Sequence, residues 1–308
     1  MQARRNILIF HAGALGDFVV TWPLAVALAR VHPQSRVFYV TQRGKGSLAE
    51  RVLRLESADW DAGWHALFTE GPTLGEAPAR LLAGAHSVVS FMSSAGDAFS
   101  QNVARVSPGA NYLSMTVSPP EAFAGHVSDH LLAQLGTWPA AHGALVQVLR
   151  SVKGRGVLGK TSEGRAVLVH PGSGARRKCW PTDRFVRFIE RLRGDGRDVR
   201  VVVGEVERET WPAAELDRLA TAAQVVRPGS YVELLDELTK SGAYVGNDSG
   251  PSHLAGIIGL PTVALFGSSS AEHWHPLGPR VRVVKGLSLE QIDVGQVYDA
   301  INEVEVSE

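Results

Sequence analysis

The chain is poor in cysteine, in excess charge and in long apolar runs, and each shortage excludes a class of protein. Cys179 is the one cysteine among 308 residues, which excludes an intrachain disulfide and a cysteine-based zinc cluster and favours a reducing compartment. Lys plus Arg and Asp plus Glu number 31 each, so the net charge is zero and no nucleic-acid partner is expected. The longest apolar run, Leu254 to Phe266, has 13 residues, short of the ~20 that a membrane-spanning helix needs. We therefore expect a cytoplasmic protein.

The N-terminal residues imitate the start of a secretory signal. Arg4 and Arg5 precede an apolar stretch at residues 7–10, but His11 and Asp17 interrupt it. An uninterrupted apolar segment is what a signal peptide requires, so we expect none here.

The length and the residue pattern predict two α/β domains. At about 150 residues per domain, 308 residues allow two. Short β-rich runs alternate with helical patterns, as is typical of parallel sheets. We expect strands over 6–10, 36–40, 87–91, 166–169, 199–203, 224–226, 243–246 and 262–266, and helices over 18–31, 128–135, 183–192, 212–222, 231–240 and 252–258.

The boundary between the two domains is expected where glycine and charge are concentrated. Residues 151–164 contain four glycines, several charges and few apolar groups, which is the composition of an exposed linker. We therefore predict domains over 1–150 and 165–308. Residues 93–125 are rich in Ser, Pro, Gly and Ala and show little pattern.

The first of three loops that follow predicted strands is His11 to Asp17. Its two glycines, Gly13 and Gly16, allow the backbone to approach a ligand, and Asp17 stands at the start of a helix. From the residues alone the better interpretation of Asp17 is an N-cap, because Asp is a preferred N-cap residue and a helix dipole favours a carboxylate there. A dinucleotide fingerprint is weaker, since the order G-x-G-x-x-G is absent.

The second loop, His170 to Pro181, combines glycines, a hydroxyl and three consecutive cations ahead of a helix. Backbone N–H groups, a helix N-terminus and positive charges are what a phosphate needs. It is not a Walker A loop, and a solvated basic loop is an equally good interpretation at this point. Cys179 lies among these cations, but we assign it no nucleophilic role.

The third loop, Gly246 to His253, is made almost wholly of small and polar residues and is followed by an apolar helix. Such a density indicates a site rather than a simple turn. It is not the nucleophile elbow of a serine hydrolase, because two residues rather than one separate Gly246 from Ser249. His253 alone would be a structural histidine.

Three short patterns resemble metal sites, and we predict that none of them binds a metal. Asp59-Trp60-Asp61 spells the D-x-D of many metal-dependent glycosyltransferases, but a three-residue match arises easily by chance and lies outside the strand-end loops identified here. His126 and His130 stand four apart without a third ligand, and His273 and His275 form another incomplete pair.

Taken together, the three loops resemble glycosyltransferase family 9, the heptosyltransferase family. The resemblance covers about residues 6–285, and its most specific part is Asn-Asp-Ser-Gly-Pro-x-His. The motifs are Leu15-Gly16-Asp17, His170-Pro171-Gly172, Lys178-x-Trp180-Pro181, Gly204-Glu205, the block from Gly246 to Ala255, and the run from Pro261 to Gly267.

The resemblance implies the GT-B fold, in which two Rossmann-like doubly wound parallel-sheet domains face each other across a cleft. It assigns the acceptor to the N-terminal domain and the nucleotide sugar to the C-terminal domain. It also implies inverting, metal-independent transfer of a heptose or related sugar from an ADP-sugar to a cell-envelope acceptor of the lipopolysaccharide core type. No cofactor is implied.

The resemblance also implies roles for individual residues. Asp17 matches the general base, which now outweighs its interpretation as a cap, and Lys178 matches the lysine that steadies the departing diphosphate. Glu205 matches the acidic residue that contacts the ribose. The expected donor-binding residues are Gly16, Ser173, Gly174, Lys178, Glu205, Asp248, Ser249, Gly250 and His253.

The acceptor side departs from the family pattern, because His11 stands where members often carry Arg or Lys. Residues 1–56 hold eight Lys/Arg against three Asp/Glu, a balance of 8 − 3 = +5. This asymmetry fits an anionic saccharide or glycolipid acceptor, such as a Kdo-bearing lipid A precursor, contacted by His11, Arg43 and Lys45. It fits an ordinary solvated face equally well. With a lipid-linked acceptor, the protein would work at the cytoplasmic face of the inner membrane.

Two further functions remain open at this point. A non-catalytic nucleotide-sugar-binding protein would use the same loops, and a GT-B-fold epimerase acting on UDP-sugars is a more remote alternative. Neither the donor sugar and base, nor the acceptor, nor the oligomeric state follows from the sequence.

Overall fold

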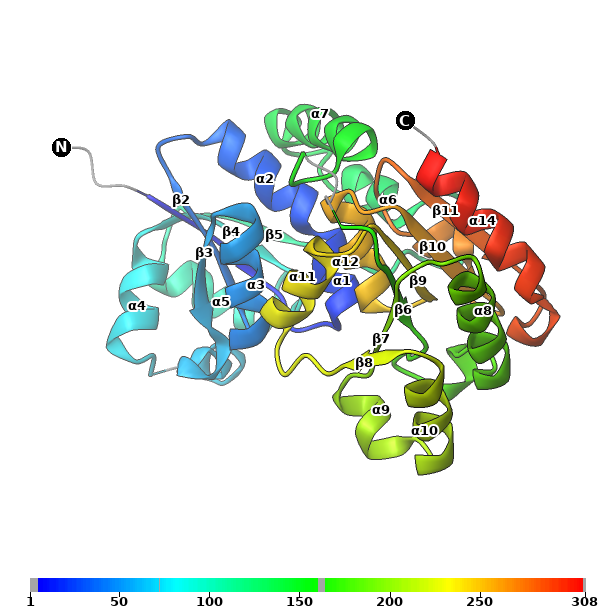
Figure 1. The fold of residues 1–308 in the computed structure, drawn as a ribbon. Helices are drawn as coiled ribbons and strands as arrows, with labels where there is room; N and C mark the ends of the chain where they lie inside the picture. The colour runs from blue at the N-terminus through cyan, green and yellow to red at the C-terminus, as the bar shows by residue number, and fades with distance from the viewer. Residues whose placement is uncertain (1–4, 72, 160–163, 307–308) are drawn as a thin grey trace. The chain divides into compact units, whose positions relative to one another are not determined.

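The computed structural model describes residues 5–71, 73–159 and 164–306, and it divides into two compact units. Unit 1 covers Met1–Arg150 and unit 2 covers Ser151–Glu308. Each unit is built around its own parallel sheet (Figure 1). The division falls inside one long helix, α7 (Pro139–Arg155).

Unit 1 contains a five-stranded parallel sheet in the order β3-β2-β1-β4-β5. The central strand β1 is buried on both faces, since Ile7, Leu8, Ile9 and Phe10 have no exposed surface. The strands are β1 Asn6–Phe10, β2 Arg36–Thr41, β3 Glu56–Asp59, β4 Ala85–Ser90 and β5 Asn111–Ser114.

Helices cover both faces of this sheet. Leu8 and Phe10 lie in one core with apolar side chains of η2, α4 and α5. On α1, Phe18 packs edge-on against Tyr39 of β2, which extends the core around the neighbouring helices. The helices of unit 1 before α7 are α1 Leu15–Val20, α2 Trp22–Val31, α3 Arg43–Leu53, η1 Trp60–Ala62, η2 Trp64–Phe68, α4 Glu76–Ala83, α5 Ala98–Val106 and α6 Val127–Ala133.

Unit 2 contains a six-stranded parallel sheet in the order β11-β10-β9-β6-β7-β8. Its chain order reverses at β6 and β9, which is the kind of switch point where ligands bind in open α/β sheets. The strands are β6 Val167–His170, β7 Val199–Val202, β8 Gln224–Val226, β9 Ala243–Asn247, β10 Thr262–Phe266 and β11 Val281–Lys285.

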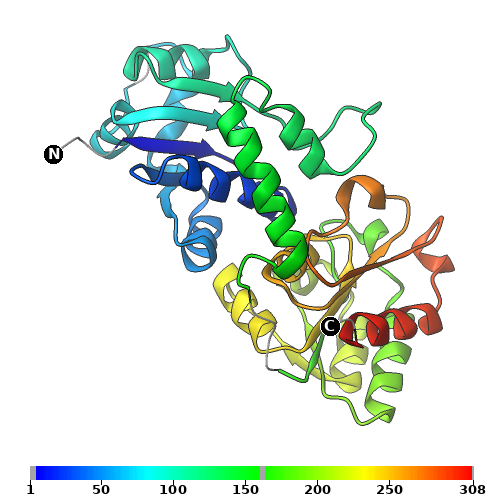
Figure 2. The ribbon, with the colours of Figure 1, turned by 90° about the horizontal axis from the view of Figure 1, so that it is seen from above.

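One face of this sheet packs against α8, α10 and α14 in a single apolar core. Figure 2 shows the C-terminal helix α14, in red, alongside α8. Helix α12 packs against β9 and β10, with α11 beside it. The helices of unit 2 are η3 Arg176–Lys178, α8 Thr182–Gly194, α9 Glu205–Thr210, α10 Ala213–Ala222, α11 Tyr231–Thr239, α12 Gly250–Ile258, α13 Ala271–Trp274, η4 Leu289–Gln291 and α14 Val294–Val306.

The predicted fold class is confirmed, but two predicted elements differ. The helix expected over 18–31 is two helices that meet at Thr21, because Pro23 has no N–H to continue the first helix and fits the opening turn of the second. The predicted linker is wrong at its start, since residues 151–155 are the last turn of α7. Residues 160–163 of that linker lie outside the described residues.

In the described part of the chain, no helix has both the length and the apolar character needed to cross a membrane.

Candidate functional site

The predicted site residues form two clusters, one in unit 1 and the other in unit 2. In unit 1 the cluster follows β1, where the chain leaves the sheet at His11 and enters α1. Asp17 lies inside α1, in its first turn, and the N-cap residue is Ala14. The N-cap interpretation of Asp17 is therefore wrong, although its carboxylate still benefits from the helix dipole. Gly16 precedes Asp17 in the same turn and is half-buried.

His11 is buried beneath this loop and stays neutral. Only 1% of its surface is exposed, and its ring packs against Phe18 and Phe91. Burial, and after it the charge of Lys45, lower the pKa of His11 to about 3. An acceptor contact whose charge changes near neutral pH is therefore not expected of His11.

The two predicted acceptor cations, Arg43 and Lys45, differ completely in their surroundings. Arg43 is exposed at the first residue of α3, as a surface contact would require. Lys45 is only 2% exposed, and its ammonium donates a hydrogen bond to the carbonyl oxygen of Gly13. The prediction that Lys45 presents its charge to an acceptor is corrected: the charge is directed at the chain's own loop.

In unit 2 the loops after β6, β9 and β10 converge at one edge of the sheet, because the carboxyl ends of parallel strands share an edge. Lys178 of η3 forms an ion pair of 2.8 Å with Asp248, which follows β9. The hydroxyl of Ser173 donates to the backbone carbonyl of Asp248 at 2.8 Å. The Lys178 side chain remains 38% exposed, so it is anchored by Asp248 and still accessible to a ligand. Gly174 is exposed beside Ser173.

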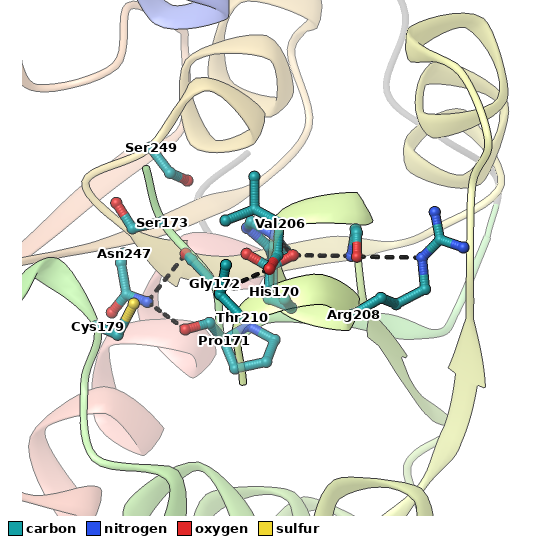
Figure 3. A network of polar contacts seen from close by, with 12 residues as sticks. His170, Pro171, Gly172, Ser173, Cys179, Val206, Arg208, Thr210, Asn247 and Ser249 are labelled. Carbon is teal, nitrogen blue, oxygen red and sulfur yellow. Dashed lines mark hydrogen bonds and ion pairs between the residues drawn. The ribbon is translucent and has the colours of Figure 1, made fainter. Parts of the chain in front are cut away.

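Asn247 holds these loops together, a role that the sequence analysis did not assign to it. Its side-chain amide donates to the carbonyl oxygens of Pro171 at 2.7 Å and Gly172 at 3.2 Å, and Figure 3 shows it pointing toward both. Its side-chain oxygen accepts the backbone N–H of Trp180 at 2.9 Å. Asn247 has no exposed surface, so these bonds are made in the interior, where leaving a polar group unpaired is unfavourable.

Two carboxylates follow Gly204 and differ in burial: Glu207 is buried, whereas Glu205, the residue predicted to contact the ribose, lies at the surface. Glu205 is exposed at the first residue of α9. Glu207 is 3% exposed, accepts the backbone N–H of Gly204 at 2.8 Å and lies 3.7 Å from His170. Burial alone would raise the pKa of Glu207, but the His170 ring and backbone N–H groups outweigh burial and hold it below its usual range. Glu207 stands at the third residue of α9 and bonds the N-cap N–H as the glutamate of a capping box does, but Gly204 has no side chain to complete the box, so the sequence carries only half of that signal.

The close packing of Gly172 against Glu207 explains why the loop after β6 has glycine there. A side-chain carbon at residue 172 would lie 1.9 Å from the carboxylate oxygen Oε1 of Glu207. No side chain fits at that distance, so Glu207 fills the space beside the Gly172 backbone.

Helix α12 places its N-terminus at the same edge. Ser249 is its N-cap residue and Gly250, half-buried, its first residue, and the Ser249 hydroxyl lies 3.2 Å from that of Ser252. His253 in the next turn is 4% exposed; burial lowers its pKa to about 4, with His275 and Lys178 lowering and Asp248 raising it. The start of α12 therefore offers backbone donors, followed in the next turn by a buried neutral imidazole rather than a cation.

A shallow surface hollow lies beside the Lys178–Asp248 pair. The predicted site residues in its lining are Lys178 and Asp248, and its other polar side chains are Arg177, and Ser268 and Ser269 of the loop after β10. Its lining residues are Arg177, Lys178, Asp248, Leu265, Gly267, Ser268, Ser269 and Leu289.

Two of the three metal-like patterns, Asp59–Asp61 and the pair of His126 and His130, serve local structure. Asp59 does end a strand, β3, which corrects its predicted placement outside strand ends, and its carboxylate accepts the N–H of Asp61 at 3.2 Å. His126 is the N-cap of α6, and His130 is bonded to Thr116 at 2.9 Å. Among the described residues, no group of three or more His, Cys, Asp or Glu side chains could hold a metal ion.

The family resemblance is confirmed by comparison with known proteins. Residues 146–297 match the family model described as glycosyltransferase family 9 (heptosyltransferase). Lipopolysaccharide heptosyltransferase 3 of Escherichia coli K12 is 25% identical over 113 residues, which is 36% of this chain and 33% of that protein. The chain thus aligns with about a third of the length of this curated relative.

Solved structures match the fold of nearly the whole chain. The ADP-heptose lipopolysaccharide heptosyltransferase II of E. coli gives a TM-score of 0.70 at 17% identity, with 98% of each chain covered. TibC of enterotoxigenic E. coli, described as an iron-containing dodecameric glycosyltransferase, gives 0.52 at 14% identity, with 99% of this chain and 77% of that chain covered. At these identities the likeness shows the GT-B fold alone.

Proposed function

We propose, because residues 146–297 match the model of glycosyltransferase family 9, that the chain transfers a heptose or related sugar from an ADP-sugar to a lipopolysaccharide core-type acceptor. The observation that carries the proposal is the Lys178–Asp248 ion pair. Both residues lie within the matched segment, and the half-exposed lysine borders a hollow beside the N-terminus of α12.

In this proposal unit 2 holds the nucleotide diphosphate. The ammonium of Lys178 and the backbone N–H groups at Ser249 and Gly250 offset the negative charge that grows on the diphosphate as it leaves. The exposed backbone of Gly174 and the hydroxyl of Ser173 lie in the same loop as Lys178, the loop after β6. Glu205, an exposed carboxylate, contacts the ribose in this proposal. Glu207 does not touch the donor and instead fixes the Gly204 loop in place.

Asp17 of unit 1 is the proposed general base. An acceptor hydroxyl attacks the anomeric carbon, the new C–O bond forms as the bond to the diphosphate oxygen breaks, and the hydroxyl proton passes to the Asp17 carboxylate. Attack opposite the leaving group inverts the anomeric configuration. The negative charge leaves with the nucleoside diphosphate, so no redox partner is required.

The acceptor and the location are part of the same proposal. Arg43 is the remaining surface cation of the predicted acceptor set, and it suits an anionic saccharide. The single cysteine and a nucleotide-sugar donor both fit a cytoplasmic protein, and a lipid-linked acceptor would bring it to the inner face of the inner membrane.

Calorimetric titration with ADP, UDP and GDP, with and without EDTA, tests the donor half of this proposal. We expect ADP to bind preferentially, EDTA to leave the affinity unchanged, and Lys178→Ala to weaken binding about tenfold or more through loss of a charge-assisted contact. Arg187→Ala, an exposed cation of α8 paired with Asp183, is the matched control and should bind like wild type. Preference for UDP, or binding abolished by EDTA, would contradict the ADP donor or the metal independence respectively.

A further inference from the structure

Lys45 occupies a position that is unfavourable for a cation. Its side chain is among the largest fully buried ones of the described residues, although removing an ammonium group from water is costly. It also stands in the first turn of α3, the end of a helix where the dipole opposes positive charge. A lysine in such a place requires strong compensating partners.

Those partners lie in the loop after β1 and in the first turn of α1, which carries Asp17. The Lys45 ammonium donates a hydrogen bond to the carbonyl of Gly13. Burial lowers the pKa of Lys45, and the Asp17 carboxylate acts in the opposite direction and favours the charged form. The titratable groups of this cluster are therefore His11 after β1, Asp17 in α1 and Lys45 in α3, of which His11 is neutral.

Gly13 contacts both Lys45 and Asp17: its carbonyl accepts the Lys45 hydrogen bond, and its Cα lies close to the Asp17 side chain. A side-chain carbon at residue 13 would lie 3.0 Å from Cε1 of His11, 3.1 Å from Cβ of Asp17 and 3.2 Å from its Oδ2. The loop thus packs tightly against the imidazole and the carboxylate, and a side chain at residue 13 would require them to shift by a few tenths of an ångström. Fixing the Gly13 carbonyl from α3 also fixes the backbone against which Asp17 rests.

We propose that Lys45 is a positioning residue for Asp17: its ammonium holds the Gly13 carbonyl, which sets the loop, and its charge keeps the neighbouring carboxylate ionised. The inference rests on the proposed function, because it is the role of Asp17 as base that gives this arrangement a catalytic purpose. Only an ionised carboxylate can accept the hydroxyl proton, and a nearby cation stabilises that form.

The pH dependence of transfer tests the proposal in Lys45→Met and Lys45→Arg. We expect Lys45→Met to move the acidic limb of the kcat profile upward by about one pH unit, since an opposite charge nearby lowers a carboxyl pKa by roughly that much or more. We also expect its plateau kcat to fall about tenfold, with the KM for donor unchanged. Lys45→Arg should retain the wild-type limb, as should the control Arg51→Met, which removes an exposed cation from the other end of α3. A Lys45→Met enzyme with the wild-type limb would overturn the proposal.

A double-mutant cycle between Lys45→Met and Asp17→Asn gives a readout that does not depend on catalysis. Measured by urea unfolding, Asp17→Asn should raise the unfolding constant about tenfold more when Lys45 is present than when it is methionine, because the single change leaves a buried ammonium without its counter-charge. Additive effects would overturn the proposal. If Asp17→Asn instead keeps wild-type turnover, the proposed function itself fails, and coupling in the cycle would show Lys45 to be a purely structural partner.

Discussion

At the scale of single residues, burial decides which side chains carry charge. His11 and His253 follow strands of different units, and both have depressed pKa values because they are buried. The Nδ1 atom of each has no hydrogen-bond partner among the described residues. Lys45 is buried as well, but it has the Gly13 carbonyl and the Asp17 charge beside it. Of the cations predicted to contact a ligand, Lys178 and Arg43 remain accessible at the surface.

Cys179 provides a residue-scale prediction about reactivity. Burial, in first place, raises the pKa of its thiol to about 11, and this outweighs the opposite effect of Arg176. The thiolate is the reactive form, so alkylation by iodoacetamide at pH 8 should be slower than that of a free cysteine by about tenfold or more. Mass spectrometry of the intact protein over time measures this rate, with the urea-unfolded protein as the reference. Equal rates in the folded and unfolded states would contradict the buried, protonated thiol.

At the scale of elements, the loops of unit 2 are held by contacts between residues far apart in the sequence. Asn247 of β9 bonds Pro171, Gly172 and Trp180. Glu207 of α9 bonds the N–H of Gly204 and approaches His170. Residues of β9 and α9 thus fix the loops of unit 2 in place through hydrogen bonds, and the loops do not depend on their own contacts alone.

Two neighbouring glycines allow a matched test of this packing. Gly172→Ala should destabilise the protein by roughly 2–4 kcal/mol, because its side-chain carbon would meet Glu207 and force a buried network apart. Gly174→Ala, two residues on, has no atom within 4 Å of the new carbon and should change stability by less than about 0.5 kcal/mol. Urea unfolding of both variants compares them directly. Equal stabilities would show that the loop yields to the larger residue.

Asn247→Ala gives a second prediction for the same network. The change leaves the carbonyls of Pro171 and Gly172 and the N–H of Trp180 without their partner in the interior. Unsatisfied buried groups of this kind are each worth about 1–3 kcal/mol, so a loss of roughly 2–5 kcal/mol is expected in denaturant unfolding. Asn302→Ala, a change in α14 at a residue bonded to Arg197 at 3.2 Å in a partly buried setting, should cost far less. A cost for Asn247→Ala no greater than for Asn302→Ala would refute the assigned role.

The sequence predicts the buried elements better than the edges of the sheets. Strands β1 and β10 are largely apolar runs, and the bounds predicted for them from the sequence are those that the structure shows. The edge strand β3 reads Glu-Ser-Ala-Asp and is half-buried throughout, so it has no apolar pattern to detect. The short strand β5 and helix α5 lie in the Ser- and Gly-rich region where no pattern was assigned.

The candidate site was predicted in part for a related physical reason. Lys178 and Asp248 lie in glycine-containing loops that follow strands, which local spacing identifies as candidate loops, and the family resemblance then singles out these two residues. Lys45 is buried, and Glu207 rather than Glu205 is buried, because of the helix face that each residue occupies. Tertiary packing decides which helix face is buried, and residue spacing alone does not predict it.

At the scale of the whole molecule, each unit contains a buried neutral histidine, and this predicts loss of stability in acid. The folded pKa values of His11, about 3, and His253, about 4, lie below the value of 6.5 expected on unfolding. The unfolded state therefore binds more protons, and the stability that each histidine contributes is complete above pH 6.5 and falls as the pH drops toward the folded pKa.

Thermal or urea unfolding between pH 7.5 and 4.5 measures this effect. We expect the free energy of unfolding to fall by about 1.4 kcal/mol per pH unit for each histidine below pH 6. His253→Gln should reduce the slope for unit 2, whereas a change at the exposed His65 should leave it unaltered. An unchanged slope in His253→Gln would contradict the buried neutral state of that histidine.

The most direct measurement of the central claim is the release of ADP from ADP-heptose in the presence of a Kdo-bearing lipid A precursor, comparing wild type with Asp17→Asn. The account predicts acceptor-dependent release by wild type, and a loss of turnover of about 10²-fold or more in Asp17→Asn with ADP binding retained, as expected when a general base is removed. Tight ADP-sugar binding by wild type without transfer to this or any related acceptor, or wild-type turnover in Asp17→Asn, would contradict it.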